Sequence, residues 1–132
     1  MKANKVDHIC VAVCNLAAAI PVWNLLLGKE GPDEEYEDEP EQIRVARYYI
    51  GEVGFEVMES TTPDGPVAKH IEARGEGIML VSMNVDSTRA VIDELGGQGV
   101  RFIGGARPFR KGEFAFVHPK SATGVLLEYI ND

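Results

Sequence analysis

Apolar and polar positions follow the same order in the two halves of the chain. Alternating apolar residues, typical of a strand, are followed each time by apolar residues at helical spacing. These strand and helix segments cover residues 6–13 and 16–27 in the first half and 78–85 and 88–96 in the second. Placing His8 on Leu80 aligns both segments, and Asn15 then falls on Ser87, so that a good helix cap stands in both places. The pattern therefore predicts an internal repeat.

Further strands are expected after each helix. Residues 43–50 and 55–60 flank a glycine-containing turn, and the second half contains strand patterns over 100–103, 112–119 and 124–130. Between the halves, the segment "DGPVAKHIEARGEG" predicts a short helix that ends at a glycine. The acidic run over 30–42 has little apolar surface to bury, so it is expected to be a solvated loop. Pro21 is expected to bend or shorten the first helix.

The predicted organisation is a single α+β domain over residues 1–132. Two βαβββ modules are expected at about 5–60 and 77–132, with a linker helix within 61–76. A chain of 132 residues is long enough to bury a substantial hydrophobic core.

Side-chain parity indicates which polar residues face inward in the first half. Followed through the first hairpin, it places Arg47 opposite Met58 and Tyr49 opposite Glu56, with all four on one face. Arginine is unusual within an apolar strand, because a guanidinium on an inward face needs an anion. Arg47 and Glu56 are therefore candidate site residues.

The same reasoning applies to the last hairpin and to the first strand. Parity places Ala115 near Glu128, with Glu113 and Val117 on the same side. A glutamate within a strand often marks a solvent face, but in "VLLEYI" apolar residues lie on both faces of the predicted strand that contains Glu128. His8 lies within "VDHICVAV", where a single histidine is more often a core residue than a metal ligand. These side chains become informative only together.

Together, the inward His8 and the paired βαβββ units resemble the vicinal oxygen chelate superfamily, also called the glyoxalase/bleomycin-resistance superfamily. Within it, "PDGPVAKHIEARGEGI" and "HPKSATGVLLEY" are similar to the methylmalonyl-CoA epimerase branch, and "PEQ" at 40–42 is also in place. The resemblance implies two modules whose mixed sheet curves around a cleft with one divalent metal. Carried over by position, the ligands are His8, Glu56, Glu128 and a histidine at position 80. Here Leu80 stands instead, since the chain has "GIMLVS" where the epimerases have "GIHHIA".

The missing histidine leaves two interpretations open. In the first, His8, Glu56 and Glu128 still hold a divalent ion such as Co²⁺, Zn²⁺ or Mn²⁺, with open positions for substrate or water. In the second, no metal is bound and Arg47, where the family usually has an apolar residue, is the fixed cation. Arg47 would then pair with Glu56 or bind a substrate carboxylate through two hydrogen bonds.

The resemblance implies an enzyme of the isomerase type. It would act through an enolate at the α-carbon of a carboxylated acyl thioester, such as an acyl-CoA, with Glu128, Arg47 and Glu56 as catalytic candidates. The alternatives are a non-catalytic binder of small molecules and a metal-independent isomerase or decarboxylase, because the superfamily supports several functions on one fold. The basic cluster "RPFRKG" at 107–112 is either a solvated loop or a contact for the phosphates of a CoA-like substrate.

Charge and composition narrow the partners. The net charge of −8 argues against nucleic acid and anionic membranes, and no apolar run approaches the ~20 residues that span a bilayer. Asp7 and His8 lie where a signal peptide needs apolar residues, so a cytoplasmic location is expected. By analogy with the superfamily, a homodimer is expected. The two cysteines are too few for a disulfide framework.

Overall fold

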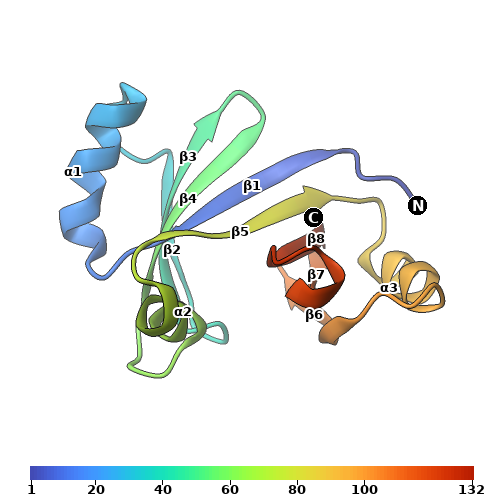
Figure 1. Ribbon diagram of the computed structural model, residues 1–132. Coiled ribbons are helices and arrows are strands. Elements are labelled where there is room, and N and C mark those ends of the chain that lie inside the picture. Colours follow the sequence, from blue (N-terminus) through green and yellow to red (C-terminus); the bar gives the residue numbers. More distant parts are fainter. The chain divides into compact units, whose positions relative to one another are not determined.

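The computed structural model describes residues 1–132 and confirms the α+β class with two βαβββ modules (Figure 1). The elements are β1 Lys5–Ala12, α1 Leu16–Leu27, β2 Glu34–Asp38, β3 Ile43–Ile50, β4 Val53–Ser60, α2 Pro66–Arg74, β5 Gly77–Asn84, α3 Thr88–Gly96, β6 Phe102–Phe109, β7 Gly112–Val117, a 3₁₀ helix Pro119–Ser121 and β8 Leu127–Asn131. Both repeat helices have the predicted bounds, and the linker helix α2 ends at a glycine as expected. No helix is both long and apolar enough to cross a membrane.

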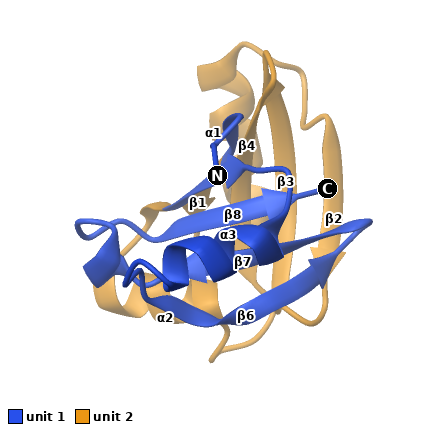
Figure 2. Cartoon of the chain, turned by 90° about the vertical axis from the view of Figure 1, so that its right-hand side faces the viewer, with its two compact units in different colours: residues 1–8, 80–132 blue, residues 9–79 orange.

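Contacts divide the chain into two compact units, coloured in Figure 2. Unit 1 contains residues 1–8 and 80–132, and unit 2 contains residues 9–79. The chain passes from one unit to the other within β1 and again within β5. The strand order is β2-β3-β4-β1 in unit 2 and β1-β5-β8-β7-β6 in unit 1. In unit 1, β5 and β8 are parallel, whereas β8 pairs antiparallel with β7.

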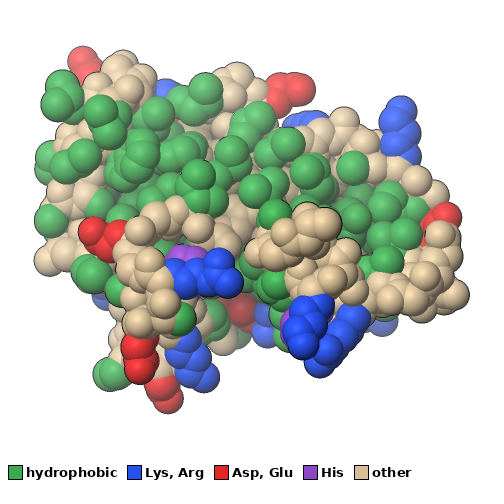
Figure 3. Space-filling view, viewed as in Figure 1, with side chains coloured by type: hydrophobic (Ala, Val, Ile, Leu, Met, Phe, Trp, Pro, Cys, Tyr) green, Lys and Arg blue, Asp and Glu red, His purple; other side chains and the backbone are tan.

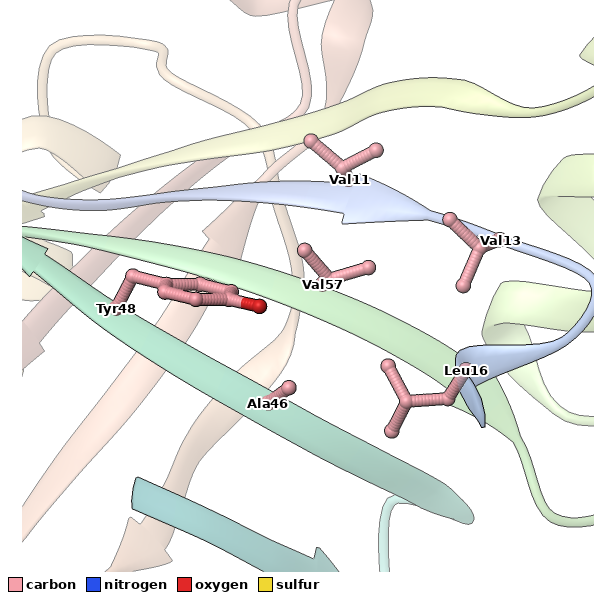
Figure 4. Close-up of a cluster of buried hydrophobic side chains, with 6 residues drawn as sticks. All are labelled: Val11, Val13, Leu16, Ala46, Tyr48 and Val57. Carbon is pink, nitrogen blue, oxygen red and sulfur yellow. The ribbon is translucent and has the colours of Figure 1, made fainter. Parts of the chain in front are cut away.

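In unit 2, α1 covers one face of the sheet. The side chains that meet there come from β1, the residue after it, the start of the helix, β3 and β4, as Figure 4 shows: Val11, Val13, Leu16, Ala46, Tyr48 and Val57. Trp23 of α1 completes this core against Phe55, with 4.8 Å between ring centroids. The outer side of α1 is also apolar, because Val22, Leu25 and Leu26 are exposed, and Figure 3 shows hydrophobic side chains over this helix.

The start of α1 is fixed by its cap. The Asn15 side chain accepts a hydrogen bond from the Ala18 N–H at 3.0 Å, and Pro21 does not shorten the helix. Changing Asn15 to Ala is expected to lower the free energy of unfolding by about 1 kcal/mol, because the Ala18 N–H loses its partner. Urea denaturation measures this change. Asn15→Ser should retain most of the stability, and equal losses in both variants would contradict a capping role.

Unit 1 repeats this arrangement with α3. Its core brings together Val85, Val91, Val117 and Tyr129, with α3 on one face of the sheet. Ser87 caps α3 by accepting from the Ala90 N–H at 3.2 Å, as the alignment with Asn15 predicts. In both units, therefore, one sheet face packs on a helix, and buried polar side chains lie on the opposite face.

The prediction of a loop over 30–42 is wrong for part of the run. Glu34–Asp38 forms β2, which pairs antiparallel with β3. The register places Glu34 opposite Arg47 and Glu37 opposite Arg44, so two acidic residues meet arginines across the strands. Opposite charges in such pairs stabilise a strand that burial alone would not support. β2 is the first of the three strands that follow the helix in the first βαβββ module.

Both hairpin registers differ from the prediction. In the first hairpin Arg47 lies opposite Glu56, and Tyr49 lies opposite Gly54, because the turn occurs one residue earlier than predicted. Each β3 residue therefore faces a β4 residue two positions away from the predicted one, and Arg47, Tyr49 and Glu56 still lie on the same face. In the last hairpin Phe116, not Ala115, lies opposite Glu128. The intervening 3₁₀ turn changes the register by one, so Glu113, Ala115 and Val117 lie on the face away from Glu128.

Candidate functional site

In unit 2, the face away from α1 carries a buried ion pair. Arg47 and Glu56 are directly opposite each other on β3 and β4, and the Arg47 Nη1 donates to Oε2 of Glu56. The exposed fractions of the two side chains are 12% and 2%. The structure thus brings together two of the predicted site residues, and each compensates the charge of the other away from water.

Further donors surround the Glu56 carboxylate. The Tyr36 hydroxyl of β2 donates to Oε2 at 3.4 Å, and the Cys10 thiol of β1 donates to Oε1 at 3.6 Å. Both oxygens of Glu56 therefore accept hydrogen bonds within unit 2, in addition to the contact with Arg47. Sequence reasoning missed Tyr36, because the acidic run had been expected to form a loop.

The Arg47 guanidinium packs against an aromatic ring and over a glycine. It lies over the Tyr49 ring, with 4.9 Å from Cζ to the centroid. On the same face, it occupies the space above Gly54, where an added Cβ would lie 2.4 Å from Nη2 and 2.5 Å from Cζ. Gly54 was not recognised from the sequence, where it reads only as part of a turn.

In unit 1, His8 and Glu128 lie together on the face away from α3. The His8 Nε2 is 3.2 Å from Oε1 of Glu128, and the other ring nitrogen, Nδ1, is 2.7 Å from Oδ2 of Asp7. A carboxylate at Nδ1 orients the ring and favours a proton on that nitrogen. Both His8 and Glu128 are buried. The structure thus brings together the second pair of predicted site residues.

Two polar atoms on this face are buried without a hydrogen-bond partner. They are Oε1 of Glu128, which lies 3.2 Å from the His8 Nε2, and Oγ of Ser82. Ser82 and Glu128 are register partners on the parallel strands β5 and β8. Leu80 lies two residues before Ser82 and is buried, so an apolar side chain stands where the resemblance implies a ligand. Buried unsatisfied polar atoms are uncommon in proteins and often mark ligand sites.

A metal ion has to be tested against these donors. In unit 2, the Cys10 thiol of β1 contacts the Glu56 carboxylate, and both are donor types that can bind a metal ion. Glu56, however, already neutralises the Arg47 guanidinium. A divalent ion at Glu56 would meet that positive charge at close range. As the side chains lie, the donor set does not fit a divalent ion at Glu56.

The other two histidines and the basic cluster take no part in the contacts described above. His70 is in the linker helix, where burial and the nearby Arg74 lower the pKa of its imidazole. His118 lies in the turn after β7, where its Nδ1 accepts a hydrogen bond from the Lys120 N–H at 3.1 Å. The basic cluster 107–112 lies at the tip of the β6–β7 hairpin, where Arg110 and Lys111 form the turn, and the Arg107 guanidinium lies over the Phe114 ring at 5.0 Å.

Comparisons with solved structures agree with this fold. Hypothetical protein BH1468 from Bacillus halodurans C-125 has a TM-score of 0.92 at 32% identity, covering 99% of this chain and 96% of that chain. Methylmalonyl-CoA epimerase from Mycobacterium tuberculosis has a TM-score of 0.89 at 28% identity, covering 98% and 88%. A methylmalonyl-CoA epimerase solved with methylmalonyl-CoA and NH₄⁺ shares the fold at 24% identity, with a TM-score of 0.90 and coverage of 99% and 96%.

Sequence comparisons lead to the same group. The uncharacterized protein YqjC of Bacillus subtilis (strain 168) is 30% identical over 129 residues, which cover 95% of this chain and 90% of that protein. The family model described as the glyoxalase/bleomycin resistance protein/dioxygenase superfamily matches residues 7–116. The chain therefore belongs to the glyoxalase/bleomycin resistance protein/dioxygenase superfamily.

Proposed function

We propose that the chain is an isomerase-type enzyme that transfers the α-proton of a carboxylated acyl thioester, with a methylmalonyl-CoA-like molecule as substrate. The likeness to methylmalonyl-CoA epimerase from M. tuberculosis supports this reaction class. One observation carries the proposal: Oε1 of Glu128 is buried without a hydrogen-bond partner, 3.2 Å from a histidine nitrogen. Such an oxygen is suited to accept a proton from carbon.

The proposed step needs a base and a cation. Glu128 takes the proton from the α-carbon, and the electron pair of the broken C–H bond moves into the thioester carbonyl to give an enolate. The Nε2 of His8 lies 3.2 Å from Oε1 of Glu128 and would hold the carboxyl group in place by accepting a hydrogen bond from it once Glu128 carries the proton. When Glu128 returns the proton to the same face, the α-carbon is restored; when water supplies a proton to the opposite face, the α-carbon is inverted, and Glu128 then releases its proton to water.

Arg47 is proposed to bind the substrate carboxylate. A guanidinium forms bidentate hydrogen bonds with carboxylates, and it is held here by Glu56 and the Tyr49 ring. This role explains why a charged side chain is retained on an inward face. Glu56 is then a positioning residue for Arg47, and no step of the proposed reaction passes through a metal.

Deuterium exchange tests the proposal directly. The protein is incubated in D₂O with methylmalonyl-CoA, and the mass of the recovered thioester is followed against a protein-free blank. We expect protein-dependent incorporation of one deuterium at the α-carbon. Propionyl-CoA, which lacks the carboxylate, is the matched control substrate and should exchange far more slowly.

The alternative function is a non-catalytic binder of small molecules. The Arg47–Glu56 pair favours this alternative to the extent that both charges are already satisfied within unit 2. Calorimetric binding of methylmalonyl-CoA without α-deuteration would support the binder and contradict the isomerase.

The oligomeric state, expected to be a homodimer, remains a prediction that sedimentation can check.

A further inference from the structure

The position of the Arg47 guanidinium depends on Gly54, which has no side chain. Gly54 is the second residue of β4, one pair away from the β3–β4 turn and opposite Tyr49, and it is buried. Glycine weakens a strand because it is flexible and packs no side chain. Its backbone here does not have the positive φ that would require glycine. The space above Gly54 is instead filled by the Arg47 guanidinium, which an alanine Cβ would approach to within 2.4 Å.

The charges around the Arg47 guanidinium show which cation faces the Glu56 carboxylate. Glu56 faces Arg47 directly, and its two oxygens also accept from Tyr36 and Cys10, neither of which carries a positive charge in these contacts. Arg47 is therefore the cation that neutralises Glu56 within unit 2. A divalent ion at the same carboxylate would be repelled by the guanidinium, and the guanidinium cannot retreat by losing its proton.

We infer that Arg47, seated on Gly54, is the permanent counter-cation of Glu56 and excludes divalent metal ions from that carboxylate. Gly54 is then the positioning residue that makes the exclusion possible. The inference concerns which cation faces Glu56, and it stands whether or not the chain proves to be an enzyme.

Metal titration tests the inference without any measurement of activity. Co²⁺ alone is titrated by calorimetry into the wild-type protein, Arg47→Met and the double variant Arg47→Met with Glu56→Gln. Methionine replaces the unbranched, aliphatic part of the arginine side chain and removes the charged guanidinium. We expect Arg47→Met to bind Co²⁺ at least about tenfold more tightly than the wild type, because the repulsion at Glu56 is gone. The added Glu56→Gln change should abolish that gain.

Gly54→Ala keeps the inference testable if Arg47→Met folds poorly. The three heavy atoms nearest to the added Cβ all belong to the far end of the flexible Arg47 side chain, so the strand should form while the guanidinium moves away from Glu56. Gly31→Ala is the matched control, because a Cβ at that position meets nothing within 4 Å. Co²⁺ should raise the melting temperature of Gly54→Ala but not of Gly31→Ala or the wild type.

Two outcomes would overturn the inference. In the first, the wild type binds one equivalent of Co²⁺ and Glu56→Gln alone weakens that binding tenfold or more. In the second, folded Arg47→Met and Gly54→Ala proteins bind Co²⁺ no better than the wild type. Neither result depends on deuterium exchange, so failure here is distinguishable from failure of the proposed reaction.

Discussion

Changing Arg47 to Met is expected to lower the free energy of unfolding by about 3–5 kcal/mol, because Glu56 is left as a buried carboxylate without its counter-charge. Glu56 is 2% exposed, so water cannot replace the lost guanidinium. The midpoint and slope of urea denaturation give the change. Adding Glu56→Gln should recover part of the loss, since neither position of the pair then carries a charge.

The same two strands provide a matched control for this prediction. Arg44 and Glu59 are also directly opposite on β3 and β4 and form an ion pair, but the Arg44 side chain is 47% exposed. Changing Arg44 to Met should therefore cost less than about 1 kcal/mol, as is usual for exposed pairs. Equal losses in the two variants would show that burial of the Arg47–Glu56 pair is not what makes it important.

Changing Glu128 to Gln is expected to slow α-deuterium exchange by about 10²–10⁴-fold, because the amide keeps the shape of the side chain and cannot accept the α-proton. Mass spectrometry of the thioester follows the exchange, and near-UV circular dichroism checks that the fold is retained. His8→Gln should produce a smaller loss, because it removes orientation and leaves the carboxylate.

Glu113 offers the control for the loss of a carboxylate. It lies on the opposite sheet face from Glu128 and pairs with Arg89, which holds the pKa of Glu113 below its usual value. Glu113→Gln should exchange deuterium at the wild-type rate. If Glu128→Gln also retained the full rate, the base would have to be another residue, and the proposed role of Glu128 would be wrong.

The sequence predicted local features well, because they depend on neighbouring residues. The bounds of α1 and α3 follow from the caps Asn15 and Ser87, and the glycine at the end of α2 follows from helix termination. The faces of His8, Arg47, Glu56 and Glu128 follow from period-2 alternation. These rules need no knowledge of distant contacts.

Register and side-chain packing were harder to predict, for physical reasons. The partner of Glu128 depends on a 3₁₀ turn between β7 and β8, and one extra residue there changes every pairing. β2 depends on arginines across the ladder, which a composition rule for residues 30–42 does not include. The role of Gly54 depends on where the end of the Arg47 side chain lies, and only the three-dimensional arrangement shows this.

The acidic strand β2 also bears on how the folded chain avoids self-association. It is the outermost strand of unit 2, so one side of its backbone has unpaired N–H and C=O groups that another strand could join. Glu35 and Glu37 are exposed along it, and Glu34 and Asp38 add two more negative charges within the same five residues. A second copy approaching this edge would bring like charges together. The charges that make the segment look unstructured in the sequence thus protect the sheet from edge-to-edge aggregation.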